Sequence, residues 1–98
     1  LPTAFAMAND SIAFGAMKAI EEAGLSIPGD ISIIGIDGHP LSGYVKPGLT
    51  TYSYDRYELA DRLVYSAINA VRNPGEIPVK MAKMVPQLII RESCRKND

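Results

Sequence analysis

Two short apolar runs in the first part of the chain each stop at a pair of polar residues. The runs, with the pairs that follow them, are Thr3–Ala8 with Asn9 and Asp10, and Ile31–Ile36 with Asp37 and Gly38. Short, continuous apolar runs bounded by turn residues are typical of buried β-strands. The second run is rich in isoleucine, which suits the centre of a parallel sheet. We therefore predict two buried strands that end in polar side chains.

The segment between the two runs predicts a helix. Its apolar residues recur at helical spacing, and either Asn9 or Asp10 can act as the N-cap. Gly24 supplies the residue that adopts a left-handed conformation after the last turn. A strand, a helix and a strand in this order form a βαβ unit, in which the strands are parallel. Both polar pairs would then lie at the carboxyl edge of the sheet, where α/β proteins bind ligands.

The rest of the chain predicts a loop, a short strand, a second long helix and a last strand. These elements are expected at residues 37–48, 49–54, 55–72 and 84–90, respectively. Asp55 and Glu58 have the spacing of a capping box at the start of the second helix. Pro86 suits an edge strand or the beginning of a strand. The fold class indicated is α/β, built on a parallel sheet.

Composition and residue types narrow the functional classes. The chain has 98 residues, enough for one domain at most, and a net charge of −1 without a basic run, which disfavours an autonomous nucleic-acid-binding domain. It has no apolar stretch long enough to span a membrane and no visible signal peptide. Because it begins with Leu1, we expect it to be a piece of a longer protein.

No catalytic or metal-binding arrangement stands out. His39 is the only histidine and Cys94 the only cysteine, whereas a zinc site needs three or four nitrogen or sulfur ligands. Asp10 and Asp37 are a candidate carboxylate pair for acid–base chemistry, but the pattern places no nucleophile or histidine beside them. We therefore expect no enzymatic activity, no cofactor and no metal, and favour recognition of a small polar molecule.

Several motifs together resemble the LacI/GalR family of bacterial transcription regulators. They cover nearly the whole chain, in the order and at the spacing of the family. The motifs are Ala8-Asn9-Asp10, Ala13-Phe14-Gly15-Ala16, Ile27-Pro28-Gly29-Asp30 leading into the second strand and Asp37, Pro47-Gly48-Leu49-Thr50-Thr51, and Leu88-Ile89-Ile90-Arg91-Glu92-Ser93. Gly38 departs from the pattern, because many members have a second Asp there.

The resemblance implies the C-terminal portion of an effector-binding domain with a periplasmic-binding-protein-like, flavodoxin-like half-domain fold. In that family two α/β subdomains enclose an effector cleft. Residues 1–53 would belong to the C-terminal subdomain, 54–83 to a crossover and a helix of the N-terminal subdomain, 84–93 to a returning strand, and 94–98 to a tail. The helix-turn-helix domain that reads DNA would lie outside this chain.

The same resemblance implies contacts to an effector and to a second subunit. The effector contacts are Asn9, Asp37 and Tyr54, a set that suits the hydroxyls of a sugar or nucleoside. The dimer contacts are Phe14, Met17, Lys18, Tyr44 and Val45. Plainer interpretations stay open: Asn9 as a helix cap, Tyr54 as packing and Phe14 as peripheral core. Asp10 is interpreted as a cap, and Gly38 as a loop residue.

Three functional classes remain. We favour effector sensing and dimerisation in a cytoplasmic LacI-type regulator, which would reach operator DNA only through a domain outside this chain and would not bind membranes. The alternative is a solute-binding protein of a sugar importer, because it shares the fold and the polar strand ends. An enzyme on the same sheet has no supporting residue set.

Overall fold

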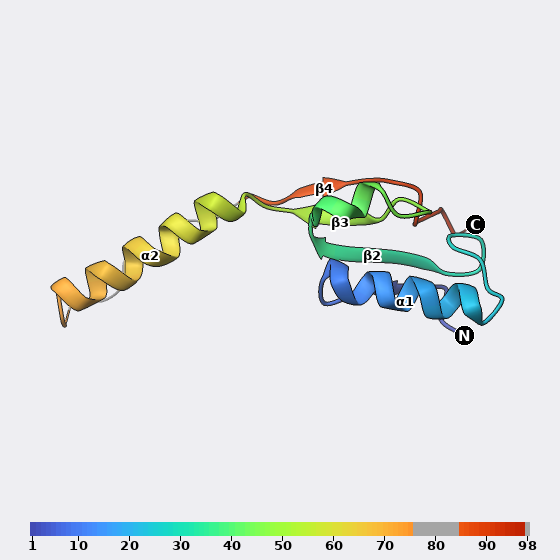
Figure 1. Cartoon of the computed structure of the whole chain (residues 1–98), viewed down its shortest axis with the longest axis horizontal. Helices are drawn as coiled ribbons and strands as arrows, with labels where there is room; N and C mark the ends of the chain where they lie inside the picture. The colour runs from blue at the N-terminus through green and yellow to red at the C-terminus, as the bar shows by residue number, and fades with distance from the viewer. Residues whose placement is uncertain (76–84, 98) are drawn as a thin grey trace. The chain divides into compact units, whose positions relative to one another are not determined.

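The computed structural model describes residues 1–75 and 85–97, which fall into two compact units. Unit 1 combines residues 1–53 with the segment from residue 87 to the C-terminus, and unit 2 comprises residues 54–86. Unit 1 holds the sheet and the first helix, whereas unit 2 holds the second helix (Figure 1). None of the described helices is long and apolar enough to cross a membrane.

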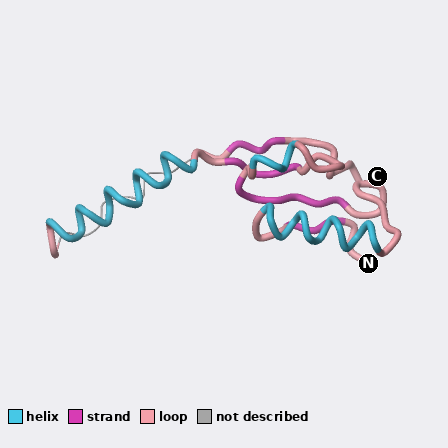
Figure 2. The backbone as a smooth tube through the Cα atoms, viewed as in Figure 1, coloured by secondary structure: helices cyan, strands magenta, loops and turns pink. Residues whose placement is uncertain are grey.

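Unit 1 is built on a sheet whose described strands follow the order β1-β2-β3-β4. They are β1 (Ala4–Ala6), β2 (Ser32–Asp37), β3 (Thr50–Ser53) and β4 (Gln87–Ile89). The first three strands are parallel, and β4 runs antiparallel to β3. The strands are the magenta segments of the tube in Figure 2. The predicted α/β fold is confirmed, and Pro86 lies just before the edge strand, where its missing N–H breaks no ladder bond.

The helix α1 (Asp10–Glu22) connects β1 to β2 and packs against β2 (Figure 1). Its N-cap is Asn9, whose Oδ1 accepts a hydrogen bond from the backbone N of Ile12 at 2.9 Å. The chain leaves the helix through Gly24, which has a φ of 81°. The helix and the sheet enclose an apolar core, formed by Ala13, Met17, Ile31, Ile33 and Leu49. The interpretation of Asp10 as the cap is wrong, because it lies inside the helix and is buried.

The segment after β4 is fastened to the sheet by side chains. Ser93 is fully buried, and its Oγ donates to the carbonyl of Ile33 at 2.6 Å and accepts from the N of Thr50 at 2.9 Å. Further along, Nε of Arg95 donates to the carbonyl of Pro28 at 3.0 Å. Arg95 lies in the segment expected to be a tail, residues 94–98, so part of that segment is bonded to the rest of unit 1.

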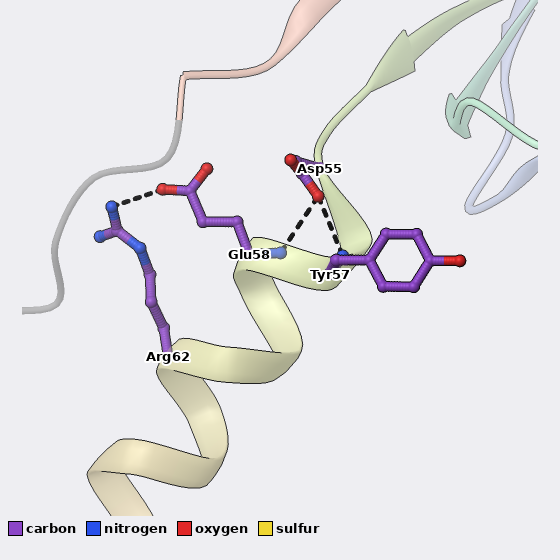
Figure 3. A network of polar contacts seen from close by, with 4 residues as sticks. All are labelled: Asp55, Tyr57, Glu58 and Arg62. Atoms are coloured by element: carbon purple, nitrogen blue, oxygen red, sulfur yellow. Dashed lines mark hydrogen bonds and ion pairs between the residues drawn. The ribbon is translucent and has the colours of Figure 1, made fainter.

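Unit 2 contains α2 (Arg56–Arg72), which begins with a side-chain cap. Oδ1 of Asp55 accepts from the backbone N of Tyr57 at 3.0 Å and of Glu58 at 3.1 Å (Figure 3). The carboxylate of Glu58 pairs instead with Arg62 at 2.6 Å. Of the two side chains of the predicted capping box, Asp55 is therefore the one that caps the helix. No residue of α2 is buried. The expected boundary at residues 83–84 lies outside the described residues.

Candidate functional site

Asn9 and Asp37 occupy corresponding positions at the carboxyl edge of the parallel strands. Ala6 of β1 pairs with Ile34 of β2, and Asn9 and Asp37 each follow this pair by three residues. Asp37 in turn pairs with Ser53 at the end of β3. The register thus brings the two polar strand ends to one edge of the sheet, as the sequence pattern predicts.

The backbone of Asp37 is strained. Its φ is 123°, and it is the one non-glycine residue with a positive φ in the described part of the chain. Side chains of L-residues clash in this region, and such conformations cost about 1–3 kcal/mol. They persist where the surrounding structure enforces them, and they concentrate at ligand-binding sites. This strain marks the strand end as a functional candidate.

Gly38 extends the unusual backbone by one residue. It has a φ of 70°, and a Cβ there would overlap the side chain of Ser53 and lie 3.1 Å from the Cα of Ser53. Neighbouring β3 therefore leaves no room for a side chain in this conformation. Glycine at position 38 therefore permits the close approach of the two strand ends.

Asn9 is the N-cap of α1, which is the plainer of its two predicted roles, and its amide nitrogen is not used in the cap. Its Oδ1 is committed to the cap of α1. Its Nδ2 makes no hydrogen bond to the described residues, and the side chain is half-buried. The helix cap therefore fixes the direction of the carboxamide while a donor stays available for a hydroxyl.

Asp10 is the residue that sequence reasoning misjudged. It is 0% exposed; Oδ1 accepts from Oγ1 of Thr51 at 2.7 Å, and Oδ2 accepts from the backbone N of His39 at 2.7 Å. Beside it lies Gly35, where a Cβ would overlap Oδ1 of Asp10. The one signal in the sequence is Gly35 itself, a glycine that interrupts a run of isoleucines in a buried strand.

The contacts of His39 stabilise the fold. Its Nδ1 accepts from the backbone N of Leu41 at 3.0 Å, which caps the short 3-10 helix η1 (Pro40–Gly43). Its ring meets Phe14 edge-to-face, with 5.4 Å between the ring centroids. Within residues 1–75 and 85–97, no group of three His, Cys, Asp or Glu side chains gathers at one place.

The other predicted site residues lie in different surroundings. Tyr54 opens unit 2 whereas Asn9 and Asp37 belong to unit 1, so its contact with an effector stays a prediction. Among the predicted dimer contacts, Lys18 is exposed and Tyr44 is 81% exposed. Phe14 and Val45 pack at the margin of the core, and Met17, only 4% exposed, lies in it, with little surface left for a partner.

Comparisons with known proteins identify the family to which the chain belongs. The model of the periplasmic binding protein-like domain family matches residues 1–94. The chain is 38% identical to the HTH-type transcriptional regulator GanR of Bacillus subtilis over 95% of its own length and 28% of that protein. It is 37% identical to the ribose operon repressor of Haemophilus influenzae, over 94% of the chain and 27% of the relative.

A solved structure gives the same result. A LacI family transcriptional regulator from Enterococcus faecium, crystallised with bound ribose, superposes with a TM-score of 0.76 at 33% identity, covering 94% of this chain and 34% of that one. The chain thus spans 27–34% of the length of these three proteins. We conclude from the match over residues 1–94 that the chain belongs to the periplasmic binding protein-like domain family, in a form similar to the one found in LacI-family transcriptional regulators.

Proposed function

We propose that this chain is the effector-sensing and dimerisation region of a LacI-type transcriptional regulator, with Asn9 and Asp37 as effector contacts. The observation that carries the proposal is the strained backbone of Asp37 at the same sheet edge as Asn9. Strain of this kind needs a reason beyond stability, and a ligand that requires a carboxylate there supplies one.

The chemistry of the two side chains suits a polyhydroxylated molecule. A carboxylate accepts hydrogen bonds from two adjacent hydroxyls, and the free Nδ2 of Asn9 donates one. A hydrogen bond to a charged group contributes roughly 1.5–3 kcal/mol. We therefore propose a sugar or a related small polar molecule as the effector, and the ribose bound to the Enterococcus faecium regulator makes D-ribose the first probe.

The relatives also bear on the alternatives. The relatives named above are transcriptional regulators. Their names do not favour a solute-binding protein of an importer, and they do not favour an enzyme. In the intact protein, we propose, two copies associate through the exposed Tyr44 and Lys18 region, and effector binding shifts the population of subdomain arrangements that the DNA-reading domains experience. Such a regulator acts in the bacterial cytoplasm.

The experiment uses the intact regulator that contains this chain and calorimetric titration with D-ribose, D-glucose, lactose and sucrose. Asp37→Asn removes the charge but keeps a residue that tolerates positive φ, so the affinity for the binding sugar should fall about tenfold or more. Asn9→Ser keeps a good N-cap but removes the amide donor, so it should weaken binding without a large loss of stability.

Glu22→Gln is the matched control, because it neutralises an exposed carboxylate at the far end of α1. It should leave the affinity unchanged. Unchanged sugar affinity in both Asp37→Asn and Asn9→Ser would mean that the effector site has been assigned to the wrong edge.

A further inference from the structure

Two consecutive backbone amides after Asp37 are held by side chains from elsewhere in the sheet. The N of Gly38 donates to Oγ1 of Thr51 at 3.3 Å, and the N of His39 donates to Oδ2 of Asp10 at 2.7 Å. The two acceptors are themselves joined, because Oγ1 of Thr51 donates to Oδ1 of Asp10 at 2.7 Å. The turn that follows β2 is therefore anchored to α1 and β3 at once.

This pair of acceptors lies inside the protein. Asp10 and Thr51 are both 0% exposed. A buried carboxylate is tolerated only when hydrogen bonds replace its water, and here each oxygen has a donor. Gly35 makes the space, because a Cβ at that position would overlap Oδ1 of Asp10 and come within 3.0 Å of Leu49. The central strand thus lacks a side chain where the carboxylate sits.

We propose that the Asp10–Thr51 pair is a positioning clamp for the effector site, an inference that rests on the function proposed above. By fixing the amides of Gly38 and His39, the pair holds Asp37 at its φ of 123° and so determines how its carboxylate is presented to the effector. Without the clamp, Asp37 relaxes toward the negative φ that L-residues prefer. Asp10 and Thr51 act through Asp37 and do not touch the effector.

The test compares Thr51→Val with Thr51→Ser in the intact regulator. Valine keeps the shape but removes the hydroxyl, whereas serine keeps the hydroxyl. Thr51→Val should accelerate hydrogen exchange at the amides of Gly38 and His39 about tenfold or more, and should weaken D-ribose binding by about the same factor. Thr51→Ser should restore both the slow exchange and the affinity.

A double variant separates positioning from general damage. In an Asp37→Asn background, Thr51→Val should cost little further D-ribose affinity, because both changes act on the same carboxylate. If Thr51→Val fails to give a cooperative melt, Asp10→Asn takes its place. This variant has the same shape but can accept only one of the two hydrogen bonds.

The outcomes distinguish this inference from the proposed function. If Asp37→Asn loses D-ribose affinity while Thr51→Val keeps it, the clamp is overturned and the effector site stands. If Asp37→Asn keeps the affinity, Asp37 is not an effector contact and the positioning role fails with it, whereas Asn9→Ser still tests the rest of the proposed site. If the wild-type protein does not bind D-ribose, exchange alone decides, and unchanged rates at Gly38 and His39 in Thr51→Val overturn the clamp.

Discussion

At the residue scale, Asp37 has to satisfy two requirements that oppose each other. Its backbone, with a φ of 123°, suits glycine, which has no Cβ to clash. An effector site at the end of β2 requires a carboxylate instead. Positions 37 and 38 both have a positive φ. The chain has glycine at position 38 but aspartate at position 37.

Replacing Asp37 by glycine should therefore move stability and binding in opposite directions. Asp37→Gly should raise the free energy of unfolding by roughly 1 kcal/mol, because the strained conformation becomes accessible without a clash. The same variant should lose at least about tenfold in sugar affinity, because the carboxylate is gone. Urea unfolding and calorimetric titration measure the two effects.

Asp37→Ala is the companion variant, because it removes the carboxylate without relieving the backbone. It should lose affinity as Asp37→Gly does, but gain no stability. An Asp37→Gly protein that is no more stable than Asp37→Ala would show that the left-handed backbone is not the source of strain at this strand end.

Residue roles differ in how far they can be predicted from sequence. Asn9 and Asp37 follow apolar runs directly, so the strand pattern alone places both at the sheet edge. Asp10 resembles a helix cap locally, but its partners Thr51 and His39 lie 41 and 29 residues further along the chain. No local pattern contains such a contact, which is why its buried role was missed.

At the element scale, elements with local signals were predicted well. The helix expected at residues 55–72 is α2 (Arg56–Arg72), because Asp55 caps it and its apolar residues recur at helical spacing. In contrast, the loop expected at residues 37–48 contains η1 (Pro40–Gly43). Proline interrupts most regular structure, yet Pro40 suits the first turn of a helix, where no N–H is needed.

The connection between α1 and β2 carries a charged turn. Oδ2 of Asp30 accepts from the backbone N of Ser26 at 2.8 Å and from its Oγ at 3.0 Å. The backbone N–H of Ser26, followed by its hydroxyl, lowers the pKa of Asp30 below its ordinary value of 3.8. Because the folded pKa is the lower one, the ionised turn stabilises the protein above the ordinary pKa and loses this contribution as the pH falls through the folded value.

The pH dependence of this turn can be measured by substitution. Asp30→Asn should lower the free energy of unfolding more at about pH 6 than at about pH 3. In the wild-type protein, acid protonates Asp30 and so removes the stabilisation that its ionised carboxylate provides. Urea unfolding of both proteins at the two pH values gives the comparison. Ser26→Ala, which removes one of the two donors, should show part of the effect. An equal difference at both pH values would contradict the interpretation.

At the scale of the whole molecule, the proposed dimer rests on an exposed aromatic residue beside a rigid turn. Tyr44 follows η1 directly and is 81% exposed. The turn itself is held by Arg91, whose Nη1 donates to Oγ of Ser42 and to the carbonyl of Leu49, both at 2.8 Å. A large side chain on a fixed support is typical of residues that dominate interfaces.

Tyr44→Asp should therefore weaken dimerisation of the intact regulator. We expect the dissociation constant of the dimer to rise about tenfold or more, because a buried charge replaces an aromatic contact. Analytical ultracentrifugation over a concentration series measures it. Asn97→Asp adds the same charge at another exposed position and should leave the dimer unchanged. Equal effects of the two variants would remove Tyr44 from the interface.

The fastening of Ser93 has a consequence for the order of events during synthesis. Ser93 forms hydrogen bonds with Ile33 and Thr50, which precede it by 60 and 43 residues. The ribosome synthesises unit 2 after Thr50 and before Ser93. At about 5–20 residues per second, the ribosome needs roughly 2–7 s to pass from Ser53 to Gln87. During that interval β3 has no β4 to pair with, and the buried amide of Thr50 has no hydrogen bond to Ser93. β4 and Ser93 therefore complete unit 1 last, although Asn9 and Asp37 are synthesised early.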